Sequence, residues 1–102
     1  MKDFDPSPAE ELVTRLLAVP GVSCRERPVM DFLAAELRRA GAPKDAIRFD
    51  QAHRRSVHGG EVGNLVCRLP GTIRGPRRLL MAHTDTVPLC EGAKPVRRGR
   101  FL

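Results

Sequence analysis

The sequence predicts an α/β fold in which two helices pack on a small mixed sheet of about three strands. Apolar residues recur at helical spacing over residues 7–40, and from residue 46 they change to alternating and then continuous runs, as in strands. The length of 102 residues allows one small domain with a single core.

The first helix is expected to start at Ser7, with Ser7 as its cap. Pro8 then takes the first helical position, and Glu10 stands three residues after the cap. Pro20 and Gly21 are expected to end it. Its apolar positions, which share one face, are Leu12, Val13, Leu16 and Leu17.

A second helix is expected to follow directly. Ser23 and Glu26 repeat the capping-box spacing, although Pro28 favours a start a residue or two later. Gly41 and Pro43 are typical of a helix end. The predicted buried stripe consists of Val29, Phe32, Leu33, Leu37 and Ala40.

Three strands are expected after the helices. Ile47 and Phe49 alternate with polar residues, and residues 64–69 form a second apolar segment beyond a polar, irregular or mobile loop at residues 51–63. Residues 79–82 (LLMA) are continuously apolar, which is typical of a strand covered on both faces. We therefore expect residues 79–82 to be the most buried strand.

Composition favours an ordinary soluble protein, with 41% hydrophobic and 29% charged residues. No apolar run approaches the roughly 20 residues that span a bilayer, and the N-terminus lacks the pattern of a secretory signal. These features predict a cytoplasmic protein without a membrane partner. The spacing of Cys24, Cys67 and Cys90 fits neither a disulfide framework nor a zinc ribbon, so three free thiols are expected.

The net charge of +6 raises the question of a nucleic-acid partner. Against such a partner, the chain has four Phe and no Tyr or Trp to stack on bases, and no segment matches an RNA-recognition or finger motif. No nucleic-acid partner is predicted. The arginines that contribute to the charge include Arg54, Arg55, Arg77, Arg78, Arg97, Arg98 and Arg100.

The clearest chemical motif is His83-Thr84-Asp85, placed where the apolar run of residues 79–82 ends. Two residues apart in extended backbone, His83 and Asp85 point to the same side. Neutral imidazole is a good zinc ligand, and a nearby carboxylate can accept its other N–H and fix the tautomer. The pair therefore suits a metal ligand and the residue that orients it.

Several stretches in this order and spacing resemble one family of two-zinc hydrolases. They are residues 19–26 (VPGVSCRE), 63–66 (GNLV), 70–71 (PG), 83–88 (HTDTVP) and 92–96 (GAKPV). The family is the co-catalytic zinc group of tripeptide aminopeptidase (peptidase T), carboxypeptidase G, aminoacylase and succinyl-diaminopimelate desuccinylase. The last stretch looks closest to the peptidase-T-like branch.

The resemblance implies that residues 1–102 are the N-terminal part of a single zinc-peptidase catalytic domain, with no second domain encoded. His83 would be a metal ligand and Asp85 the catalytic Asp beside it, in a site that holds two Zn²⁺ ions when complete. The family's bridging Asp, Glu-Glu pair, further acidic ligand and distant His have no counterpart here. The resemblance thus implies a metallopeptidase-type hydrolase of peptide or acyl-amino-acid bonds. This chain would be a fragment of that enzyme and is expected to be inactive alone.

Other polar residues near the motif are assigned no role. Glu91 matches no family ligand, and His53 and His58 are expected to be solvated or structural. The alternative hypothesis is a small basic non-catalytic binding domain, in which His83 and Asp85 are ordinary surface residues at a strand end, or a degenerate remnant. Substrate and oligomeric state are left open.

Overall fold

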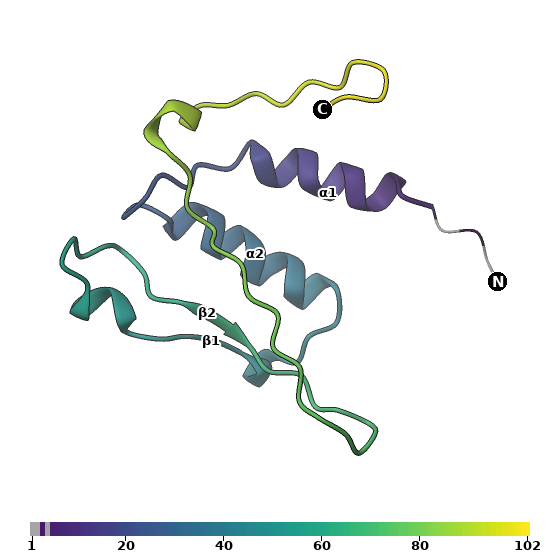
Figure 1. Ribbon diagram of the computed structural model, residues 1–102, viewed down its shortest axis with the longest axis vertical. Coiled ribbons are helices and arrows are strands. Elements are labelled where there is room, and N and C mark those ends of the chain that lie inside the picture. Colours follow the sequence, from purple (N-terminus) through teal and green to yellow (C-terminus); the bar gives the residue numbers. More distant parts are fainter. Residues whose placement is uncertain (1–2, 4) are drawn as a thin grey trace.

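The structure is a computed structural model that describes residue 3 and residues 5–102. Helices α1 and α2 lie side by side, and the β1–β2 hairpin lies on the far side of α2 from α1 (Figure 1). The last part of the chain runs back along α1. In chain order the elements are α1 (Ser7–Leu17), α2 (Arg27–Arg39), η1 (Lys44–Ala46), β1 (Ile47–Phe49), η2 (Ala52–Arg55), β2 (Leu65–Cys67) and η3 (Pro88–Cys90), the η elements being short 3₁₀ helices.

Helix α1 begins where the sequence predicts, but with a different cap. Pro6 is the N-cap residue, and the carboxylate of Asp5 accepts the backbone N–H of Ser7 at 2.9 Å. The predicted apolar face is only partly covered, since Val13 is 43% and Leu17 51% exposed. α1 is therefore an amphipathic helix whose apolar face still has open surface.

Helix α2 begins at Arg27, so the prediction of Ser23 as its cap is wrong. Glu26 is the N-cap residue, and its carboxylate accepts the backbone N–H of Cys24 at 2.9 Å. The later start has a physical reason: Pro28 has no N–H to donate and fits the first turn of a helix. The hydroxyl of Ser23 is thereby left available for another partner.

Helix α2 ends just before Gly41, as the sequence predicts. Gly41 has φ +102°, and the N–H of Ala42 bonds to the carbonyl of Leu37 at 3.0 Å while that of Gly41 bonds to Arg38. These two bonds form a Schellman motif. The buried stripe differs from the predicted one, because it consists of Val29, Met30 and Ala34, whereas Ala40 is exposed.

The sheet has two strands in the described part of the chain, β1 and β2, and they pair antiparallel. Ile47 lies opposite Cys67, and Phe49 opposite Leu65. The alternation of Ile47 and Phe49 that predicts the first strand is confirmed. The expected mixed sheet of about three strands is wrong in its third strand, as residues 79–82 do not join it.

Residues 79–82 lie in an unpaired segment instead of a buried strand. Leu79, Leu80 and Met81 are 80%, 95% and 84% exposed. No backbone hydrogen bond involves residues 79–82 within the part of the chain that the structure describes. A continuous apolar run indicates that a segment can be buried, but burial requires neighbouring strands and helices on both faces, which the described residues do not supply.

The core is small. It lies between α2, the end of α1 and the loop that joins β1 to β2 (residues 50–64, the hairpin loop). Val29, Met30 and Val62 are its buried members, with Leu16, Val19, Leu33, Phe49 and Leu65 packed against them. The accessible surface is 9154 Å², whereas a compact monomer of 11.3 kDa exposes about 5,700 Å². The radius of gyration is 16.0 Å, against about 13 Å for a compact chain of this length.

Among residues 3 and 5–102, no helix has both the length and the apolar character that crossing a bilayer requires.

Candidate functional site: the His83–Asp85–Ser23 cluster

The structure brings His83 and Asp85 into direct contact, as their spacing predicts. Nδ1 of His83 lies 3.0 Å from Oδ1 of Asp85. The His83 side chain is 87% exposed and that of Asp85 42%. One ring nitrogen of His83 is thus engaged by the carboxylate, and the rest of the ring faces solvent.

A third residue, Ser23, belongs to the same cluster. Its hydroxyl donates to Oδ2 of Asp85 at 2.6 Å, across 62 positions of sequence. That length is typical of a hydroxyl donating to an ionised carboxylate. The sequence predicts Ser23 to be a helix cap, and only its place in the 19–26 stretch links it to the site.

Backbone pairing holds Ser23 beside Asp85. Val22 and Thr86 form an isolated parallel bridge, in which the N–H of Thr86 donates to Gly21 at 2.8 Å and the N–H of Ser23 to Thr86 at 3.2 Å. Thr84, between the two site residues, directs its hydroxyl to the sulfur of Met30 at 3.4 Å. The segment that carries His83 and Asp85 is therefore tied to the turn after α1 and to the core.

The charge of Asp85 indicates which ring nitrogen of His83 carries the proton. The hydrogen bonds from Ser23 and then from His83 hold the pKa of Asp85 below the usual range of an aspartate, with burial opposing the shift. Asp85 is therefore ionised at neutral pH and can only accept hydrogen bonds. It follows that Nδ1 of His83 carries a proton, and in the neutral ring Nε2 keeps its lone pair for another partner.

The geometry does not suit a serine nucleophile. In a Ser–His–Asp triad the hydroxyl is bonded to the imidazole, which takes its proton. Here the hydroxyl of Ser23 is bonded to Asp85, and Asp85 lies between the serine and His83. The arrangement instead orients an imidazole.

A cavity of about 510 Å³ adjoins the cluster. It lies between α2 and the hairpin loop, and its lining includes His53, Asn64, His83 and Asp85. Nδ1 of His53 is buried with no hydrogen-bond partner among the described residues. From the sequence, His53 is expected to be solvated or structural, whereas the structure places it on the same cavity as the motif.

The remaining polar residues near the motif lie apart from the cluster. Glu91 is 3.7 Å from Arg25 in an exposed ion pair. His58 is exposed in the hairpin loop. Cys24, Cys67 and Cys90 are free thiols, as predicted.

The side chains of the cluster suit one metal ligand, His83, and one residue that orients it, Asp85. A catalytic zinc site needs about three protein ligands and a water. Among residues 3 and 5–102, no three His, Cys, Asp or Glu side chains come together in a way that could hold a metal ion. His83 would supply Nε2 to a metal, and Asp85 would fix the ring.

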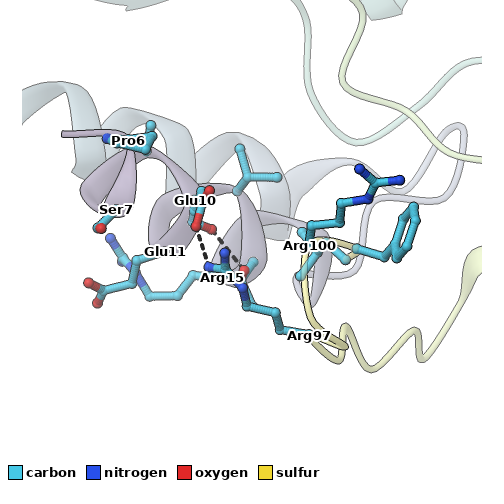
Figure 2. Close-up of a pocket in the computed structure, with 12 residues that line it drawn as sticks. Pro6, Ser7, Glu10, Glu11, Arg15, Arg97 and Arg100 are labelled. Carbon is cyan, nitrogen blue, oxygen red and sulfur yellow. Dashed lines mark hydrogen bonds and ion pairs between the residues drawn. The ribbon is translucent and has the colours of Figure 1, made fainter. Parts of the chain in front are cut away.

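A second pocket, beside α1 and the C-terminal residues, is separate from this cluster. It has a volume of about 500 Å³ and lies between α1 and the last residues of the chain. Figure 2 shows Arg97 reaching from the C-terminal segment to Glu10 on α1, with which it forms an ion pair, while Arg100 points away from that pair. Its lining contains neither His83 nor Asp85.

No family model, no curated protein and no solved structure matches this chain.

Proposed function

We propose that this chain is part of a zinc-dependent exopeptidase or amide hydrolase, to which it contributes one metal ligand, His83, and the orienting residue Asp85. The observation that carries the proposal is the contact of 3.0 Å between His83 Nδ1 and Asp85 Oδ1 on a largely exposed ring. This contact directs the lone pair of Nε2 away from the carboxylate, as zinc ligation by histidine requires.

The open surface of the chain supports the view that the site is incomplete. Residues 79–81 lie just before His83 and are almost fully exposed, although they are apolar. Further strands packed beside them would bury this surface and would bring additional side chains next to His83. Further residues would therefore complete both the sheet and the ligand set.

In the complete site, bound zinc would activate a water and polarise the carbonyl of a peptide or acyl-amino-acid bond. His83 would bind through Nε2, Asp85 would accept the Nδ1 proton and hold the ring, and residues outside this chain would supply the general base. The chain by itself is then expected to be inactive.

The test is an assay of a longer protein, expressed from the reading frame that includes any codons beyond Leu102. We expect it to hydrolyse a tripeptide or an acyl-amino acid only with zinc present, and His83→Ala to reduce the rate at least a hundredfold. His58→Ala, a histidine away from the cluster, is the matched control and should leave the rate unchanged. Full activity in His83→Ala would contradict the proposal, as would a frame that adds no acidic residues.

Zinc titration of the present chain provides a second arm. With all three cysteines changed to Ser, calorimetry should detect no tight stoichiometric site, because one histidine cannot replace three ligands. A nanomolar site lost in His83→Ala would show that these residues build a complete metal centre, and the view of a partial site would be wrong.

The alternative is a small basic domain that binds an anionic partner. It is favoured by exposed arginines that form no ion pair within the described residues, such as Arg77 and Arg78. Binding to a polyanion such as heparin that weakens steeply with salt and is lost in Arg77→Ala/Arg78→Ala would support it.

A further inference from the structure

We propose that Ser23 is a positioning residue: its hydroxyl clamps the carboxylate of Asp85 so that Asp85 holds His83 in the tautomer with the proton on Nδ1. The inference rests on the proposed function for its purpose, since that tautomer exposes Nε2 as a ligand atom. The hydrogen-bond geometry that carries it stands independently of any metal.

The two oxygens of Asp85 are divided between two donors. Oδ2 accepts from Ser23 Oγ at 2.6 Å, and Oδ1 faces His83 Nδ1 at 3.0 Å. Ser23 Oγ also lies 3.5 Å from the carbonyl oxygen of Thr86, but a hydroxyl has one proton and the carboxylate is much the closer acceptor. Without Ser23, the carboxylate group could rotate and present either oxygen, or neither, to the ring.

The backbone around Ser23 fixes the position from which its side chain extends. Residues 22–25 form a tight turn, in which the N–H of Arg25 donates to Val22 at 2.8 Å. Cys24, at the third position, has φ +69°, which is uncommon for a residue with a side chain. The turn is further held by the bond from Cys24 N–H to Glu26.

The side chain of Ser23 is not part of the core that the described residues form. Ser23 is exposed, and the second helix is capped without it. Among the described residues, the hydrogen-bond partners of its hydroxyl are Asp85 and the adjacent carbonyl of Thr86. The contact with Asp85 is thus the interaction that the hydroxyl supplies.

The experiment measures the tautomer of His83 by long-range ¹H–¹⁵N correlation in the metal-free chain, at a pH where the ring is neutral. In the unchanged chain the Nδ1–H form should predominate. Ser23→Ala should lower the ratio of Nδ1–H to Nε2–H severalfold, and Ser23→Thr, which keeps the hydroxyl, should restore it. Ser56→Ala is the matched control, because within the described residues the hydroxyl of Ser56 accepts the N–H of His58 and forms no hydrogen bond with His83 or Asp85.

An unchanged tautomer ratio in Ser23→Ala would overturn the proposal. If Ser23→Ala does not fold, Ser23→Cys carries the test, since a thiol is a weaker donor of similar shape and should give an intermediate ratio. Zinc alone, added at rising concentration, separates this inference from the proposed function. Perturbation of His83 by weakly bound zinc without any effect of Ser23→Ala refutes only the clamp. An effect of Ser23→Ala without perturbation by zinc upholds the clamp, and the proposed function is then decided by the assay of the longer protein.

Discussion

At the scale of single residues, the hairpin loop depends on one carboxylate and one glycine. Oδ1 of Asp50 accepts the backbone N–H of Ala52 at 2.9 Å and that of Asn64 at 2.8 Å, and Oδ2 accepts the side-chain amide of Asn64 at 2.9 Å. These bonds hold the pKa of Asp50 below the usual range of an aspartate. The two ends of the loop are therefore joined by a side chain in addition to the strand pairing.

Gly63 is required where the chain passes Asp50, and its replacement is the first stability prediction. A Cβ at residue 63 would lie 2.3 Å from both the carbonyl oxygen and Oδ1 of Asp50. We expect Gly63→Ala to lower the free energy of unfolding by about 1–3 kcal/mol, measured by urea unfolding. Gly75→Ala is the control, since nothing lies within 4 Å of a Cβ there. Equal stability of the two variants would show that the loop closes in another way.

At the scale of elements, α1 and α2 are joined by one ion-pair cluster. The guanidinium of Arg15 on α1 contacts both oxygens of Glu36 on α2, at 2.8 and 3.3 Å, and Arg39 contacts Glu36 at 2.8 Å. Arg15 also stacks over the ring of Phe32, 5.6 Å from its centroid. The bidentate contact of Arg15 with Glu36 and the stacking of Arg15 on Phe32 make this pair more directional than an ordinary surface pair.

The pH dependence of stability follows from the pKa of Glu36. The hydrogen bond from Arg15 lowers that pKa in the folded chain, with burial opposing it and the charges of Arg15 and Arg39 assisting. A group whose pKa is lower in the folded than in the unfolded state stabilises fully above its unfolded pKa and loses this effect as pH falls through the folded value. We expect Glu36→Gln to lower the melting temperature at neutral pH and to approach the unchanged chain in acid.

Asp45→Asn is the control for this measurement. Asp45 forms no ion pair within the described residues, so its replacement should shift the melting temperature little at any pH. A Glu36→Gln difference that stayed constant from neutral pH to acid would mean that the carboxylate charge is not what joins the helices.

At the scale of the whole molecule, the unburied segment before His83 predicts the pattern of hydrogen exchange. Residues 79–81 have no backbone hydrogen bond in the described part of the chain and are largely exposed. Their amides should exchange at rates close to those of an unfolded chain, whereas amides near Ala34 in α2, which is 2% exposed, should be protected. Protection of residues 79–81 equal to that of α2 would show that this segment is paired in solution.

The sequence by itself determined the local elements and the key contact of the candidate site. Helical spacing, Pro28 and Gly41 located α2, and the alternation of Ile47 with Phe49 located β1, because these signals act over a few neighbouring residues. The contact of His83 with Asp85 likewise follows from a spacing of two residues.

Tertiary structure alone decided which surfaces are covered and which distant residues meet. Residues 79–82 have the composition of a buried strand, but burial depends on partners far along a chain, and here the segment remains exposed. Ser23 reaches Asp85 across 62 residues through the pairing of Val22 with Thr86, a contact that no local pattern encodes. The same hydroxyl can cap a helix or bind a carboxylate. The position of the segment that carries Asp85 determines which of the two it does.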